Sequence, residues 1–568
     1  MKTLSLNKDL ILVLSLAIIC QIIALYHSPI RYECDAASYY SIAQNYITFL
    51  KPTFDSYRPH LFPLFIVLTG QFLFHSFWGT ILGHSVLSVV SVVLVYRMLF
   101  PIHRYLGLLT SLVFCGSFIP FTATTLMLAE QLFMFNIIAT YYFLSRFIFS
   151  RKIKYQYLTA LFGLFAMFTR WEGQFVLIGS LLGLFFYSIK TRFKPSKLLK
   201  ENLKHFTICV GLVLMFLGWW SYKRCVYLND FSQFGKIQGG TAQQLFWRIK
   251  NDLPDHKLTW NNIINQWGKK SEKIVESSPK ITNLISVNHG PKSKKAYDTI
   301  LSLLEKDPLY FKKYEGGMHS LNPANSKSTD ELYYEHYGKF GWNPKRIVDN
   351  FFAEDNLSLH YVFHIGEFLK TKLGPKESEN LIQEWMFETV LKNPWIFLNM
   401  IGEGLSMFGV SFPNTLSIIL NKELPILSSF SSYWEYGGEY FWFYMDFNLS
   451  NCTKQLPTKQ FEEHKKNYDR FLTKKTLASR YHKVTSILRN MTRNILGPLL
   501  LLTWLFLFFN PVKIFYFSLS FGLLGILSVV ATLGSGVGTR YEYATLPLII
   551  ILSMCGMLQV VKNEFFKK

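Results

Sequence analysis

Long apolar stretches alternate with short polar segments at both ends of the chain. A helix needs about 20 apolar residues to cross the hydrocarbon core of a bilayer, or somewhat fewer when flanking side chains reach the interface. Ten stretches meet or nearly meet this length, which predicts a polytopic α-helical membrane protein with about 10 transmembrane helices. They are residues 9–26, 79–96, 105–120, 127–145, 156–170, 173–189, 205–221, 494–509, 514–533 and 543–561.

Five of the apolar segments need separate treatment. The stretches 156–170 and 173–189 share one short turn, so they form either a hairpin or one long buried helix with a break. The runs 61–74 and 395–412 are too short or too polar to span, and we expect helices that lie along the outer interface. The first stretch has the basic flank of a signal peptide, but no cleavage site of small residues follows it, which predicts an uncleaved helix.

Basic clusters between the apolar stretches predict the orientation, because loops rich in Lys and Arg stay in the cytoplasm. Both chain ends then lie inside, and the domains follow from this topology. An N-terminal transmembrane catalytic module spans residues 1–221 and includes a first outer loop at 27–78. Residues 222–492 form an extracytoplasmic domain, and 493–568 carry the C-terminal transmembrane helices.

Composition supports the membrane assignment and excludes several other classes. Half of the chain is hydrophobic, aromatic residues make up 17% and charged residues only 17%. The net charge of +22 comes from short clusters between apolar stretches, and no nucleic-acid-binding motif accompanies it, so no nucleic acid partner is expected. The seven cysteines show no CxxC pair, which argues against a structural zinc site or a disulfide framework.

In this topology, charged residues of several distant segments lie at the outer membrane edge. A charge at membrane depth costs a few kcal/mol and is retained mainly where it faces a cavity or another charge, so convergence of several suggests a site. The alternatives are a bridge between Arg170 and Glu172 across a turn, and extension of Arg224 and Arg540 to lipid headgroups. The set comprises Asp35, Arg58, Glu130, Arg170, Glu172, Lys223, Arg224, Arg540 and Glu542.

A carboxylate surrounded by guanidinium and ammonium groups suits the displacement of a phosphate leaving group. The cations would absorb charge that develops on the phosphate, while the carboxylate removes a proton from the acceptor. Nucleotides are not expected on this side of a membrane, so the activated donor would be a sugar on a polyprenyl phosphate.

Five short motifs make the interpretation more specific. They are CDAASYYSIAQNYITFLKPTFDSYRPHLFPLFIVL in the first loop, then LAEQLFMFNIIATYYFLSRF, LFGLFAMFTRWEGQFVLI, WWSYKRC and RYEYATLPLIII. In this order they resemble segments of the glycosyltransferase C superfamily, in its branch related to protein O-mannosyltransferases and lipid A aminoarabinose transferases. The resemblance covers residues 1–225 and 494–561. The chain departs from the family pattern at His60, Gln131 and Trp171.

The resemblance implies transfer from a polyprenyl-phosphate donor with inversion at the anomeric carbon. It implies that Asp35 is the catalytic base, at the start of an interfacial helix whose dipole favours an anion, and that Glu130 orients an acceptor or a metal. From the residues alone, Asp35 also fits an N-cap of a helix over 36–50, and Glu130 a buried ion pair with an arginine. Candidates for the donor phosphate are Arg58, Arg170, Lys223 and Arg540, and other substrate-binding candidates are Tyr39, His60, Glu172 and Tyr541.

The cofactor, the alternatives and the location complete the predictions. Glu33 and Asp35 offer at most two oxygen ligands, so no metal is assigned, with a divalent cation as the alternative. A transporter or flippase for a lipid-linked saccharide, and a non-catalytic partner that keeps the transferase fold, are the competing functions. We expect a multi-pass protein of the bacterial cytoplasmic membrane, rather than the endoplasmic reticulum, that glycosylates a protein, glycan or lipid of the cell envelope.

Overall fold

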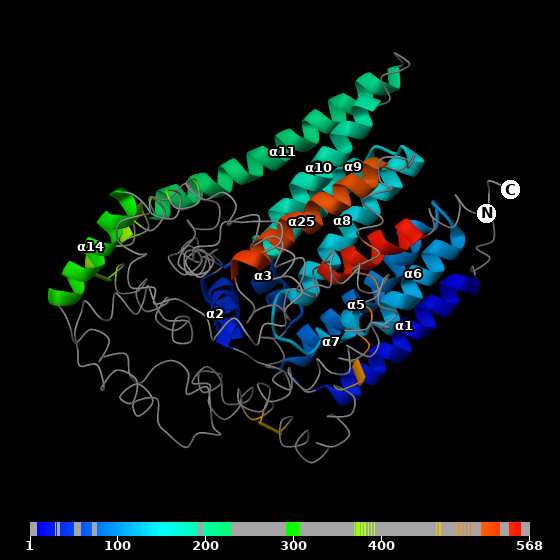
Figure 1. Cartoon of the computed structure of the whole chain (residues 1–568). Coiled ribbons are helices and arrows are strands. Elements are labelled where there is room, and N and C mark those ends of the chain that lie inside the picture. Colours follow the sequence, from blue (N-terminus) through cyan, green and yellow to red (C-terminus); the bar gives the residue numbers. More distant parts are fainter. Residues whose placement is uncertain are drawn as a thin grey trace, which may run out of the picture. The chain divides into compact units, whose positions relative to one another are not determined.

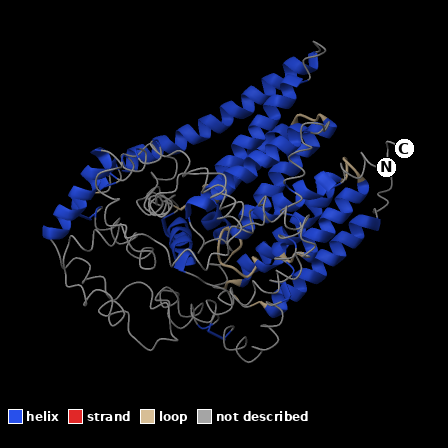
Figure 2. Cartoon of the chain, in the orientation of Figure 1, coloured by secondary structure: helices blue, strands red, loops and turns tan. Residues whose placement is uncertain are grey.

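A computed structural model describes residues 8–28, 30, 34–49, 58–70, 76–190, 197–228, 291–306, 513–533 and 545–557, with scattered single positions between 369 and 500. These residues are mostly helical and contain no strand (Figure 2). The chain divides into two compact units. The first comprises Met1–Phe234, Leu405–Val529 and Gly538–Lys568, and the second Gly235–Gly404 and Val530–Val537.

Four helices of the first unit are long and apolar enough to cross a membrane (Figure 1). They are α1 (Lys8–His27), α5 (Trp78–Leu99), α8 (Glu130–Ser150) and α11 (Lys197–Leu228). Each coincides with a stretch predicted from the apolar pattern, because a long uninterrupted apolar run has few alternatives to a spanning helix. The helices therefore support the prediction of a membrane protein.

Further predicted stretches form shorter apolar helices. The stretch 105–120 was expected as one helix, which is wrong at its end: α6 (Arg104–Gly116) stops early, Phe118 has a left-handed φ of 56°, and α7 (Ile119–Thr122) follows. A bulky residue in this conformation breaks the helical hydrogen-bond pattern. The other helices of this kind are α10 (Gly173–Lys190), α25 (Lys513–Leu533) and a helix at Thr545–Met557. Of the predicted span 494–509 the structure describes only Leu496 and Leu500, both helical and buried.

The stretches around the sequence FTRWEGQF form a hairpin. Helix α9 (Lys154–Thr169) ends one residue before Arg170, and α10 begins at Gly173 and packs back against α9. Gly163 of α9 lies against Leu177 and Ser180 of α10, as two antiparallel helices require. The alternative of one long helix with a break is therefore excluded.

Gly173 is required for this hairpin. A Cβ atom at Gly173 would overlap the backbone of Ala166, which cannot move aside as a flexible side chain could. We expect Gly173→Ala to lower the free energy of unfolding by about 1 to 3 kcal/mol, as overpacking does in well-packed interiors. Gly211→Ala in α11, where an added Cβ meets nothing within 4 Å, is the control. Equal thermal stability of the two variants in detergent would contradict the assignment.

Polar side chains link the helices inside the first unit. The Tyr141 hydroxyl of α8 donates to the Ser518 carbonyl of α25 (3.1 Å), and the Ser518 hydroxyl donates to the Gly179 carbonyl of α10 (2.5 Å). The Gln21 amide of α1 donates to Ser85 of α5 and to Thr124, both at 3.2 Å. Bonds of this kind between apolar helices contribute to packing where lipid offers no polar partner.

Two short helices occupy the predicted first outer loop. Helix α2 (Cys34–Phe49) packs against α3 (Leu61–Leu68), and α3 in turn contacts α5 and α9. With eight residues α3 is too short to cross a bilayer, which agrees with the prediction that 61–74 does not span. Pro63 falls in the first turn of α3, where its missing N–H costs no hydrogen bond.

Among the parts that can be described, the second unit contributes α14 (Pro291–Lys306). The interfacial helix predicted at 395–412 lies outside the described residues. The boundaries predicted for the extracytoplasmic domain, 222 and 492, are not tested and stay a prediction.

Candidate functional site

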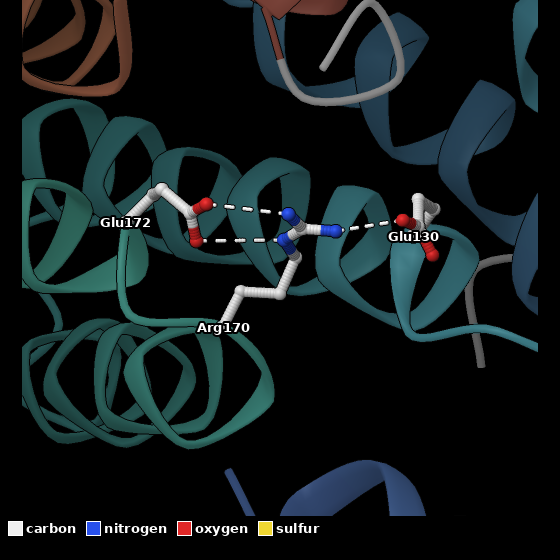
Figure 3. A network of polar contacts seen from close by, with 3 residues as sticks. All are labelled: Glu130, Arg170 and Glu172. Carbon is white, nitrogen blue, oxygen red and sulfur yellow. Dashed lines mark hydrogen bonds and ion pairs between the residues drawn. The ribbon is translucent and has the colours of Figure 1, made fainter. Parts of the chain in front are cut away.

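Three predicted site residues form one ion-pair network (Figure 3). Arg170 lies in the turn between α9 and α10, and its Nη1 donates to Glu130 Oε1 at the start of α8 (2.7 Å). Its Nη2 and Nε donate to the carboxylate of Glu172 at 3.2 and 3.4 Å. The side chains of Glu130, Glu172 and Arg170 are 2, 6 and 12% exposed, so the network is almost completely buried.

This geometry changes the role expected of Arg170. Its guanidinium is paired with two carboxylates, and the three groups together carry one negative charge when both acids are ionised. The sequence offered two alternatives to substrate binding here: a bridge between Arg170 and Glu172 across the turn, and a buried ion pair of Glu130 with an arginine. The structure shows both contacts. We therefore assign Arg170 to holding the two acids in position, rather than to binding a phosphate.

An aromatic stack connects the first loop to α5. The His84 ring of α5 is stacked on Phe62 and Phe65 of α3, with centroids 5.7 and 5.3 Å apart. The His84 Nδ1 lies 3.3 Å from the Thr124 carbonyl, so this nitrogen carries the proton. The stack thus holds α3 against α5.

Arg58 and Tyr39 lie next to each other, and Tyr39 contacts Phe62. The Arg58 guanidinium lies 5.2 Å from the centroid of the Tyr39 ring, a cation–π distance. Tyr39 is buried on α2 and its ring packs edge-on against Phe62 at 5.1 Å. Two candidates separated by 19 positions in the sequence are therefore neighbours.

His60 connects the first loop to the C-terminal part of α11. Its Nδ1 lies 2.5 Å from the Tyr46 hydroxyl of α2, and its ring packs edge-on against Trp220 of α11 at 4.8 Å. Trp220 also contacts Phe168 of α9 at 5.2 Å, two residues before Arg170. Arg224, one turn after Trp220, is buried, which does not fit an extension to lipid headgroups.

His60 should make the stability of the protein depend on pH. Burial, with a contribution from the charge of Arg224, lowers the pKa of His60 from 6.5 to about 4. Because the pKa of His60 is lower in the folded state than in the unfolded state, the unfolded state binds more protons between pH 4 and 6.5. Stability is then greatest above pH 6.5 and falls by about 3 kcal/mol as the pH drops to 4. Thermal unfolding of the wild type and of His60→Phe, measured from pH 4 to 8, tests the prediction. The wild type should lose this stability at low pH and His60→Phe should not. An equal loss of stability in both proteins would contradict the role of His60.

The structure brings the predicted site residues together in smaller groups: Glu130, Arg170 and Glu172 form one, Tyr39 and Arg58 another, and His60 contacts Trp220 of α11. Lys223 is half-buried on α11, next to Arg224 in sequence but about 100° around the helix from it. Asp35 lies in the first turn of α2, which begins at Cys34, so it is not the residue preceding the helix that an N-cap would be. Arg540 and Tyr541 lie outside the residues that the structure describes.

Sequence reasoning missed Tyr46 and Trp220, and assigned no binding role to Arg224. The spacing of Trp220 and Arg224, four residues apart on one helix, predicts that both face the same side, and could have drawn attention to them. Tyr46 gave no such signal, because its contact with His60 depends on how the loop folds back. Within the described ranges, no group of three or more His, Cys, Asp and Glu side chains could hold a metal ion.

Comparisons with known proteins add no family assignment. No protein-family model, curated protein or solved structure matches this chain. The function must therefore be argued from the site.

Proposed function

We propose that this chain is a membrane glycosyltransferase that moves a sugar from a polyprenyl-phosphate donor to an extracytoplasmic acceptor. In this proposal the full chain has about 10 transmembrane helices in a glycosyltransferase C-type fold, and it resides in the bacterial cytoplasmic membrane. The charged residues of the first loop and of the helix ends then lie at the outer membrane edge.

One observation carries the proposal: residues of the first loop meet residues of α9, next to the α9–α10 turn in sequence, and of α11. Arg58 and His60 lie on the loop side, and the ion-pair network around Arg170 lies on the helix side. Charged groups that are distant in sequence are expected to come together in this way when they surround a substrate, because isolated burial is costly.

The reaction assigns a task to each group. An acceptor hydroxyl oxygen attacks the anomeric carbon, and its proton passes to Asp35, which lies where the α2 dipole favours an anion. The bond between the anomeric carbon and the phosphate oxygen breaks, and its electron pair leaves with polyprenyl phosphate. Cations of the site, among them Arg58, Lys223 and Arg540, stabilise the charge on that phosphate. Glu130 and Glu172, which pair with Arg170, orient the acceptor in this proposal.

The test is donor cleavage by the purified full chain in nanodiscs. With a polyprenyl-phosphate sugar and an extract of envelope acceptors, we expect release of polyprenyl phosphate together with a glycosylated product, both followed by mass spectrometry. A transporter would instead move the intact donor across a proteoliposome membrane without cleavage. That result, or no turnover of any polyprenyl-phosphate sugar, would overturn the proposed function.

A further inference from the structure

Four basic side chains gather where α8 ends and α9 begins. Arg146 lies one turn before the end of α8 at Ser150, Arg151 and Lys152 lie in the short turn, and Lys154 opens α9. Arg146 is half-buried, and the other three are exposed. Basic residues at the end of a spanning helix are common on the cytoplasmic side, so their presence alone does not indicate a binding site.

Two of these cations lie against one aromatic ring. The Arg146 guanidinium lies 5.8 Å from the centroid of the Tyr155 ring, and the Lys154 amine lies 5.4 Å from the same centroid. Phe143 of α8 stacks on this ring at 6.1 Å. The ring attracts each cation but does not neutralise it, so two like charges are kept close together. An anion that contacts both cations would offset their repulsion.

Other arginines that lie over an aromatic ring are neutralised by carboxylates of the chain itself. Arg104 lies 6.0 Å from the centroid of a tyrosine ring and pairs with Asp9. Arg170 lies 5.9 Å from the centroid of a phenylalanine ring and pairs with two glutamates. Arg146 and Lys154 form no ion pair with any residue that the structure describes. These two cations are therefore available to an anion from outside the chain.

The Arg146 side chain shows the same need for an acceptor. Its Nε is buried and has no hydrogen-bond partner in the described part of the chain. Buried polar atoms in folded proteins are nearly always paired. A phosphate oxygen suits this position, because guanidinium binds phosphate through parallel N–H···O bonds.

Arg151 adds a third cation at a position that favours glycine. It follows the last residue of α8 and has a left-handed φ of 56°. Glycine adopts this conformation most readily and is the usual residue after a helix that ends in this way. The chain thus retains a basic side chain at this turn at a cost in backbone energy.

An exposed apolar face continues from Lys154 along α9. Leu158 and Leu161 follow Lys154 at spacings of four and three residues, so the three side chains lie on one face of the helix. Leu158 is half-buried and Leu161 is 41% exposed. A ligand with an anionic head and an apolar chain matches this face, whereas a free phosphate would use only the cations.

We propose that Arg146 and Lys154 bind the headgroup phosphate of an anionic phospholipid, with an acyl chain of the lipid along Leu158 and Leu161. Arg151 and Lys152 strengthen the attraction, since each basic side chain near an anionic bilayer surface contributes to it. The site is separate from the candidate catalytic site. Arg146 lies 16 residues after Glu130 on the same helix, about 24 Å along its axis. The inference therefore does not rest on the proposed function.

Lipid titration of the purified full chain tests the proposal. Delipidated protein in detergent is titrated with phosphatidylglycerol, with phosphatidylcholine of the same acyl chains, and with glycerol 3-phosphate. Native mass spectrometry gives the affinity for the first lipid bound. We expect the wild type to bind phosphatidylglycerol about tenfold more tightly than phosphatidylcholine. Arg146→Gln and Lys154→Gln should each weaken phosphatidylglycerol binding about fivefold and leave phosphatidylcholine binding unchanged.

Two further variants separate a specific site from folding and from net charge. Arg146→Lys keeps the positive charge and should stay within about twofold of the wild type. Arg104→Gln also removes a cation that lies over a tyrosine ring, but Asp9 already neutralises Arg104. It should therefore leave phosphatidylglycerol binding unchanged. Lys154 is exposed, so Lys154→Gln tests the site without disturbing the packing of α8 against α9.

Four results would overturn the inference. They are equal affinity of the wild type for the two phospholipids, wild-type affinity for phosphatidylglycerol in Lys154→Gln, an equal loss in Arg104→Gln, and binding of glycerol 3-phosphate as tight as that of the lipid. The third would show that lipid binding follows net charge alone, and the fourth that the cations serve a soluble anion.

Discussion

Replacing Arg170 by methionine is expected to lower the free energy of unfolding by about 3 to 5 kcal/mol, the cost of leaving buried charges without a partner. The substitution removes the guanidinium from Glu130 and Glu172, whose side chains are 2 and 6% exposed. Equilibrium unfolding of the purified variant in mixed micelles measures the change. Adding Glu130→Gln and Glu172→Gln to Arg170→Met should recover much of the loss, since the uncompensated charges are then gone.

The chain contains a matched control for this prediction. Arg104 also pairs with a carboxylate through two contacts, 2.6 and 2.9 Å from Asp9, but its side chain is 55% exposed. Solvent screens such a pair, so Arg104→Met should change stability little. Equal effects of Arg104→Met and Arg170→Met would show that burial of the network around Arg170 is not what stabilises it.

Replacing Asp35 by asparagine is expected to reduce sugar transfer about 10²- to 10⁴-fold, the usual contribution of a positioned general base. Asparagine keeps the size of the side chain but cannot take the proton of the acceptor. Affinity for polyprenyl monophosphate and thermal stability should stay at the wild-type values, because the change affects the proton transfer and not the anion site. Initial rates of transfer, measured alongside lipid affinity, separate the two effects.

Glu33→Gln is the control for Asp35→Asn, since it removes a carboxylate two residues away in the same segment. It should retain nearly full activity. A wild-type rate in Asp35→Asn, or an equal loss in Glu33→Gln, would mean that Asp35 is not the base.

The sequence predicted the elements better than their contacts. The predicted ends of α1 and α5 differ from the observed ends by at most three residues. An apolar run long enough to span a bilayer has few structures open to it other than a spanning helix. The end of the stretch 105–120 was missed, because nothing in the apolar pattern marks the left-handed conformation of Phe118. Local periodicity reports burial and length, but not a single backbone angle.

The candidate site was predicted as a set of residues but not as an arrangement. The short-range pair of Arg170 and Glu172 could be anticipated from their spacing in a turn. The contact of Arg170 with Glu130 joins residues 40 positions apart, and that of His60 with Trp220 joins residues still more distant. Such contacts depend on how α3 and the α9–α10 hairpin pack. The sequence pattern therefore could not identify Arg170 as the arginine that pairs with both acids.

The central claim is that the first loop and the end of α11 hold the phosphate of a lipid-linked substrate between them. Photocrosslinking with a polyprenyl phosphate that carries a diazirine next to the phosphate, followed by peptide mapping, tests it most directly. We predict label in residues 58–70 and 217–228, and its loss when unmodified polyprenyl phosphate is added in excess. Label confined to other segments, or label in these two that excess lipid phosphate does not displace, would contradict the account.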